Sequence, residues 1–172
     1  YCTFNDNDGG LAFNMNETQG YSAEVSHCVF NNGAGTDLFV YSTGTANFQM
    51  WQCEFLGSEI GLQMIGVEGA TIYQTSFEGT NQALNISGSE YFWVRQCSFT
   101  NGLGSADNVY INSSTCSFED NEFTDNLKSG TTGALFATST NIDLEDCIFT
   151  GNQTAGSGGA VTAEGGSASF LR

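Results

Sequence analysis

Two acidic pairs have the residue types and spacing that could do chemistry: Glu119/Asp120 and Glu145/Asp146, 26 residues apart. Two carboxylates at a defined separation can hydrolyse a glycosidic bond, one as the acid and the other as the base or nucleophile. Carboxylates that lie close together repel one another unless a proton or a cation intervenes. We therefore expect either a calcium site formed by Asp120, Asp146 and Asp143, or a solvated acidic face.

Large apolar side chains are also expected on the outside of the protein. In the strands described below, alternation turns Trp51, Tyr73 and Trp93 outward. The same alternation turns three further residues outward: Phe39, Tyr41 and Ile65. Aromatic stripes on a surface often mark interfaces. Three uses are open: cover by a turn of the same chain, stacking against sugar rings, and lateral contact with another chain.

Four Asn-x-Ser/Thr sequons are candidates for N-glycosylation in a eukaryotic secretory pathway: Asn16, Asn85, Asn112 and Asn152. Asn85 and Asn112 fall at expected outward or strand-end positions, where a glycan would find room. A chain rich in Asn, Ser and Thr also produces sequons by chance, so their number alone is weak support.

The composition restricts the partners. Lys and Arg total three against 19 Asp and Glu, which gives a formal charge of −16. Nucleic acid is excluded because almost nothing could neutralise its phosphates, and an anionic membrane surface is disfavoured for the same reason. No apolar run approaches the ~18 residues of a membrane span. Cations, neutral glycans and other proteins remain as partners.

A sequence repeat must position these candidates. Cys-x-Phe and its near-copies, such as "HCVFNNG" at His27 and "QCSFTNG" at Gln96, recur seven times. The anchor phenylalanines, which we expect to form a core ladder, are Phe4, Phe30, Phe55, Phe77, Phe99, Phe123 and Phe149. They are separated by 22 to 26 residues, a period that is typical of a solenoid.

Two further segments recur between the anchors and alternate with a period of two, as at Leu38/Val40 and Phe48/Met50. Three short strands per repeat, with turns between them and no helix, predict an all-β, single-stranded parallel β-helix of about seven coils. Each coil lies ~4.8 Å from the last, so like residues stack on like. Residues 1–172 are expected to form one domain.

Five of the six cysteines share one coil position, which Thr75 and Asn121 fill in the other coils. These five are Cys2, Cys28, Cys53, Cys97 and Cys147. A disulfide between neighbours such as Cys28 and Cys53 is geometrically conceivable. We favour the alternative, a buried stack of small, weakly polar thiols.

The motifs resemble those of a known family. "FTGN" at Phe149 and "FTDN" at Phe123 match the F-x-x-N element of polymorphic outer-membrane protein repeats. "GGAV" at Gly158 matches their G-G-A-[ILV] element, and "TGAL" at Thr132 half matches it. The resemblance implies a right-handed β-helix of the pectin-lyase-like class and an extracellular or cell-surface setting.

Pectate lyases of that class need Asp ligands for calcium and a basic residue that abstracts a proton. The basic residues are Arg95, Lys128 and Arg172, and no acidic cluster lies in their own turns. The sequence therefore does not favour a lyase.

The chain opens inside one copy of the motif and stops before the next anchor. We expect either a piece of a longer array or an open-ended unit that stacks head to tail. The function expected is a non-enzymatic structural or adhesive one, in a surface filament, appendage, sheath or adhesin. The partners would be other copies, other β-helical subunits or glycans, and calcium is the one candidate cofactor. The alternative is a carbohydrate-binding or polysaccharide-degrading module.

Overall fold

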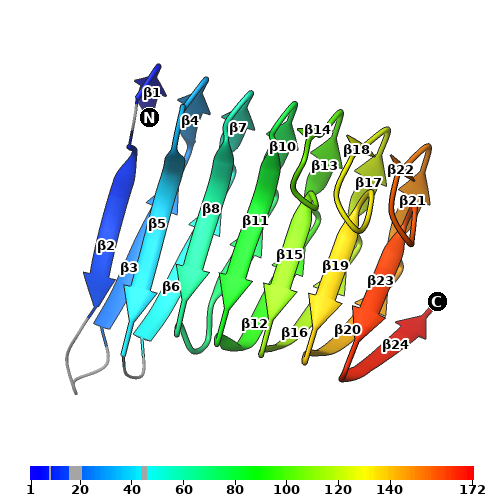
Figure 1. Cartoon of the computed structure of the whole chain (residues 1–172). Coiled ribbons are helices and arrows are strands. Elements are labelled where there is room, and N and C mark those ends of the chain that lie inside the picture. The colour runs from blue at the N-terminus through cyan, green and yellow to red at the C-terminus, as the bar shows by residue number, and fades with distance from the viewer. Residues whose placement is uncertain (8, 16–20, 44–45) are drawn as a thin grey trace.

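The computed structural model describes residues 1–7, 9–15, 21–43 and 46–172. It is a β-solenoid of three seven-stranded parallel sheets and one small three-stranded sheet (Figure 1). Among the described residues there is no helix long and apolar enough to cross a membrane. All the elements that the structure describes are strands, so the all-β prediction is confirmed, and the number of coils is near the predicted seven.

Each coil contributes one strand to each main sheet. Sheet A comprises β1 (Cys2–Asn5), β4 (Cys28–Asn31), β7 (Glu54–Leu56), β10 (Ser76–Glu78), β13 (Ser98–Thr100), β17 (Glu122–Thr124) and β21 (Ile148–Thr150). Sheet B comprises β2 (Leu11–Met15), β5 (Thr36–Ser42), β8 (Ile60–Ile65), β11 (Gln82–Ser87), β15 (Val109–Asn112), β19 (Leu135–Thr138) and β23 (Val161–Glu164). Sheet C comprises β3 (Tyr21–Ser26), β6 (Ala46–Trp51), β9 (Thr71–Tyr73), β12 (Glu90–Arg95), β16 (Thr115–Glu119), β20 (Asn141–Glu145) and β24 (Ser167–Leu171).

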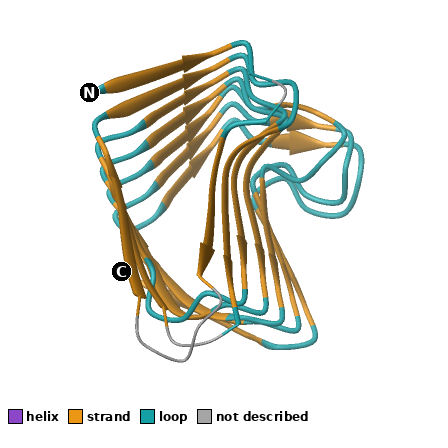
Figure 2. Cartoon of the chain, turned by 90° about the vertical axis from the view of Figure 1, so that its left-hand side faces the viewer, coloured by secondary structure: helices purple, strands orange, loops and turns teal. Residues whose placement is uncertain are grey.

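Single residues with positive φ bend the chain from one wall to the next (Figure 2). Between sheets C and A these residues are His27, Gln52, Gln74, Gln96, Asp120 and Asp146. A left-handed backbone costs a non-glycine residue about 1–2 kcal/mol. Stacking offsets part of this cost, since Gln52 donates to Gln74 and Gln74 donates to Gln96, both at 3.3 Å.

The anchor phenylalanines form the predicted ladder inside sheet A. Each pairs in register with the next, from Phe4 with Phe30 to Phe123 with Phe149. Neighbouring ring centroids lie 4.6 to 5.1 Å apart, and the planes are within 11° of parallel. The five middle rings are fully buried and the two outermost are partly buried. Along sheet A, the core of the protein is therefore a continuous stack of phenylalanine rings.

The coil position that cysteine occupies most often lies at the corner after sheet C, where its side chains donate hydrogen bonds to backbone carbonyls. All six cysteines are free. Of the five aligned thiols, Cys28, Cys53 and Cys97 are buried as expected, whereas Cys147 is partly buried and Cys2 is exposed. Cys53 and Cys97 each donate to the carbonyl two residues earlier, at 3.5 and 3.3 Å, and Thr75 does so at 3.1 Å. Burial raises the pKa of Cys53 to about 11 and that of Cys97 to about 12, so these thiols are neutral.

A fourth sheet, here called the shelf, was not expected from the sequence. It consists of β14 (Leu103–Gly104), β18 (Leu127–Lys128) and β22 (Gln153–Thr154). Its loops project from the wall between sheets A and B, and they belong to the last three coils (Figures 1 and 2). In the last three coils, additional residues between the sheet A strand and the sheet B strand therefore form this corner.

Candidate functional site

The outer face of sheet C carries the predicted aromatic residues in two parallel rows. In one row Trp51 lies beside Tyr73, and Tyr73 beside Arg95. In the other row Trp93 lies beside Thr71. Trp51 and Tyr73 are half-buried, whereas Trp93 is 44% exposed. The structure thus brings the three predicted residues onto one wall, on successive coils, as expected.

The first row borders a hollow of about 300 Å³. The residues that line it are Gln49, Met50, Trp51, Thr71, Tyr73 and Arg95. Arg95 Nη2 donates to Glu119 Oε1 at 2.8 Å, which holds the guanidinium at the edge of the hollow. Aromatic faces beside amide, hydroxyl and guanidinium groups can stack on a flat apolar surface and bind hydroxyl groups at its edge.

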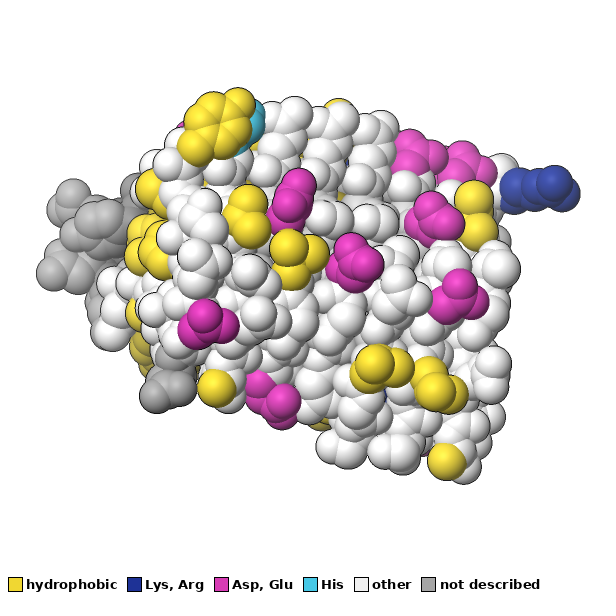
Figure 3. Space-filling view, turned by 90° about the horizontal axis from the view of Figure 1, so that it is seen from above, with side chains coloured by type: hydrophobic (Ala, Val, Ile, Leu, Met, Phe, Trp, Pro, Cys, Tyr) yellow, Lys and Arg dark blue, Asp and Glu magenta, His cyan; other side chains and the backbone are white. Residues whose placement is uncertain are grey.

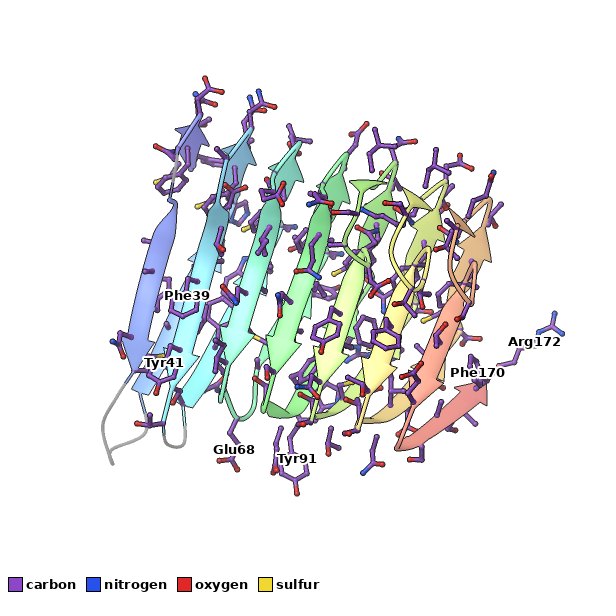
Figure 4. All side chains as sticks on the ribbon, viewed as in Figure 1. Phe39, Tyr41, Glu68, Tyr91, Phe170 and Arg172 are labelled. Carbon is purple, nitrogen blue, oxygen red and sulfur yellow. The ribbon has the colours of Figure 1, made fainter. Side chains whose placement is uncertain are left out.

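A second hollow of about 140 Å³ lies beside the first and was missed by the sequence analysis. Tyr91, Trp93 and Asp143 are among its lining residues. Tyr91 is 56% exposed and has a φ of 55°, at an irregularity where the register shifts between Glu90 and Phe92. Figure 4 shows it projecting from the edge of the sheet. Such bulges re-aim side chains and are over-represented near functional sites.

The other predicted aromatic residues lie on a different wall. Phe39 and Tyr41 are outward residues of sheet B (Figure 4), and Tyr41 pairs with Ile65. All three are half-buried. The same wall carries a second pair that the sequence analysis missed, Tyr110 and Phe136, with ring centroids 5.8 Å apart. The predicted outward residues therefore form two separate surfaces, one on sheet C and one on sheet B.

The predicted calcium ligands are not gathered into one site. Asp120 and Asp146 occupy equivalent corner positions of neighbouring coils, whereas Asp143 projects from β20 beside Ser117. In the described part of the chain no group of three or more His, Cys, Asp or Glu side chains could hold a metal ion. Across the sheet A side the acidic groups are spread out among uncharged residues (Figure 3).

The sequons have different surroundings. Asn85 and Asn112 are outward and half-buried on sheet B, as expected. Asn16 lies outside the described residues. The structure does not support Asn152 as a glycosylation site. Its Nδ2, the atom that would carry a glycan, donates to the carbonyl of Phe123 at 2.8 Å, and its Oδ1 accepts from Asn126. This partly buried side chain is therefore occupied in binding the preceding coil.

Lys128 also turns inward, which the sequence analysis did not anticipate. It is 3% exposed, and its Nζ donates to the carbonyls of Thr80, Asn81 and Leu103 at 2.9, 2.6 and 3.2 Å. Burial lowers the pKa of Lys128 to about 8, although the nearby carboxylates of Asp107 and Glu59 act in the opposite direction. No outer wall presents this amine.

The chain matches the family model described as "Right handed beta helix region" over residues 11–171. No curated protein and no solved structure matches it.

Proposed function

We propose, from the premise that the chain belongs to the right-handed β-helix family, that it is a non-enzymatic structural or adhesive protein. It would act at the cell surface or outside the cell as a rigid segment of a filament, appendage, sheath or adhesin. Its walls would contact other copies of itself or other β-helical subunits.

The observation that carries the proposal is the continuity of the stacks. Seven phenylalanine rings follow one another without a break, and parallel ladders join every coil to the next. Bending the axis would separate rings and backbone hydrogen bonds on one side of the solenoid. Such a body transmits force or fixes a distance, which are structural tasks.

Two of the three Lys and Arg residues support a non-enzymatic task. Proton abstraction needs a base on an outer wall, within reach of the substrate. Arg95 is paired with Glu119, and Lys128 is enclosed by backbone carbonyls. Neither is placed as a free base on a wall.

The resemblance to polymorphic outer-membrane protein repeats is part of the same proposal. Asn126 and Asn152 close the two F-x-x-N elements. Each donates from its amide to the carbonyl of the preceding coil's anchor, Phe99 or Phe123, at 2.9 and 2.8 Å. The motif thus has a clear structural role in this chain.

Electron microscopy with and without a calcium chelator tests this function. We expect lateral or end-to-end assemblies that grow with protein concentration, and fraying in chelator if cations bridge the acidic corner residues. The variant Trp93→Ser should weaken lateral assembly, whereas Leu103→Ser, at an exposed apolar residue of the shelf, serves as the matched control. Isolated particles at every concentration, with or without chelator, would contradict the proposal.

A second candidate is a carbohydrate-binding module, favoured by the hollow beside Trp51 and Tyr73. Neutral oligosaccharides would stack on these rings, since a charge of −16 disfavours acidic ones. Titration with neutral oligosaccharides, followed by calorimetry, should then show saturable binding that Trp51→Ala abolishes and Tyr110→Ala leaves unchanged. Unchanged binding in Trp51→Ala would exclude this hollow.

A further inference from the structure

Lys128, Asn81 and Glu59 form a chain of contacts at the base of the shelf: Lys128 contacts the backbone of Asn81, and the side chain of Asn81 contacts the exposed carboxylate of Glu59. Lys128 Nζ lies 2.6 Å from the backbone oxygen of Asn81. The carboxamide of the same Asn81 donates from Nδ2 to Glu59 Oε1, also at 2.6 Å. Asn81 thus connects the amine of Lys128, through its backbone oxygen, with the carboxylate of Glu59, through its side-chain amide.

The backbone holds the carboxamide of Asn81 against β14, the strand that pairs with the one carrying Lys128. Its Oδ1 accepts from the N–H of Ala106 at 3.4 Å. The carboxamide also fills the space over Gly104, where a Cβ would come within 2.7 Å of Asn81 Cγ. Gly104 is the register partner of Lys128. A glycine at this position therefore leaves room for the carboxamide beside the lysine strand.

The amine has the surroundings of a nucleophile. Its hydrogen-bond partners are neutral carbonyls, and the carboxylates that act on it are Asp107 and Glu59. Burial lowers the pKa of Lys128 to about 8. A larger share of the amine is then neutral near pH 7 than for an ordinary lysine. A buried, neutral lysine amine can attack a carbonyl carbon.

We propose that Lys128 and Asn81 join in an intramolecular isopeptide bond, with Glu59 as the proton carrier. The neutral Nζ leaves the backbone oxygen of Asn81 and attacks Cγ of the same residue. Glu59 accepts a proton from Nζ and delivers it to Nδ2. The Cγ–Nδ2 bond then breaks, and one ammonia molecule leaves as the new amide forms. No oxidant or other reactant is needed.

The bond would link coils that are not neighbours. Asn81 precedes β11, whereas Lys128 lies on β18, two coils further along the axis. The cross-link would pass beside β14 and fasten the start of the shelf to the wall. This inference goes beyond the proposed function and stands on different residues.

Intact-mass measurement of the unmodified chain tests the proposal directly. We expect a mass lower than that of the sequence by one ammonia molecule. Because the chain contains only three basic residues, its tryptic map is simple. After denaturation and reduction, cleavage at Arg95 alone should leave 1–95 covalently attached to 96–172. Three separate peptides, 1–95, 96–128 and 129–172, would overturn the proposal.

Variants of Lys128 and Glu59 test the role of each residue in the reaction. Lys128→Arg keeps the positive charge and should restore the full mass. Glu59→Gln should slow or abolish the loss of ammonia, whereas Glu78→Gln, an exposed glutamate on sheet A, should leave it unchanged. Loss of water in place of ammonia would overturn the assignment to Asn81 and point to a carboxylate such as Asp107. Unchanged cross-linking in Glu59→Gln would remove Glu59 from the reaction.

Discussion

The inner side of sheet A and the outer face of sheet C both carry rows of aromatic residues, but they are built in opposite ways. Inside, every coil supplies the same residue at the same height, and the rings are nearly parallel. Outside, the rows change residue from coil to coil, from Trp51 to Tyr73 to Arg95.

This difference shows which structural role the repeated positions have. A position that repeats in every coil holds the solenoid together, because its partner is always the same side chain one coil away. An outward position that departs from the repeat is free to meet something outside the chain. Exposed Trp93 and Tyr91 belong to the second kind, and buried Phe77 belongs to the first.

Truncation of an inner ring should produce the largest effect and the sharpest contrast. Phe77 is fully buried between Phe55 and Phe99, at centroid distances of 4.7 and 5.1 Å. We expect Phe77→Ala to lower the free energy of unfolding by about 3–5 kcal/mol, because it leaves a cavity in the stack. Chemical denaturation measures this change.

The matched control is Trp93→Ala, which removes a larger ring from the outer face. Its expected cost is within about 1 kcal/mol, as for other exposed positions. Equal losses in the two variants would show that the outer row is as much a part of the fold as the inner one.

The second prediction extends the contrast to amides. Asn126 is fully buried, its Oδ1 accepts from the N–H of Gly102 at 2.9 Å, and its Nδ2 donates to the carbonyl of Phe99. Asn126→Ala should cost about 2–3 kcal/mol, because these buried groups lose their partner. Exposed Gln153 on the shelf is the control, and Gln153→Ala should change the unfolding free energy by less than about 0.5 kcal/mol.

The third prediction concerns a buried acid. Asp37 is 3% exposed and accepts a hydrogen bond from Ser58. Burial raises the pKa of Asp37, and the bond from Ser58 offsets part of that rise. The folded state therefore keeps this proton to a higher pH than the unfolded state does, so the group stabilises the fold most below about pH 3.9.

Its contribution is lost as the pH rises through that value towards the raised pKa. The difference in unfolding free energy between the unmodified chain and Asp37→Asn should accordingly shift in favour of the variant from pH 3.5 to 7. Denaturation curves across this range measure the shift. A difference that stays constant with pH would show that Asp37 ionises equally in both states.

The smallest predicted effect lies on the outer face. Tyr91 has a positive φ that glycine adopts freely. Tyr91→Gly should therefore be more stable than Tyr91→Ala by about 1 kcal/mol, since only the alanine variant keeps the strained backbone. Thermal unfolding of the two variants compares them, and a more stable alanine variant would contradict the account of the bulge.

The sequence predicted the part of the molecule that repeats. The anchors from Phe4 to Phe149 and the alternation of strands were sufficient to assign the fold and its register. The outward direction of Trp51, Tyr73 and Trp93 followed from the same alternation.

The features that the sequence did not reveal are those that give no periodic signal in residue type. The equivalent shelf positions are Gly104, Lys128 and Thr154, which share no residue type and so give no periodic signal. Tyr91 projects because of a local shift in register that alternation cannot show. Asn152 fits two patterns, a sequon and the F-x-x-N element, and only its contact with Phe123 decides between them.

The corner glutamines have a consequence for how such a chain can change length over generations. Gln52 and Gln74 are 22 residues apart and occupy the same corner conformation, with φ of 52° and 48°. A tandem duplication of residues 52–73 in the gene would therefore insert one whole coil, with every ladder still in register. Loss of the same segment would remove a coil equally cleanly. Copying errors that would destroy a globular core become changes of length in this architecture.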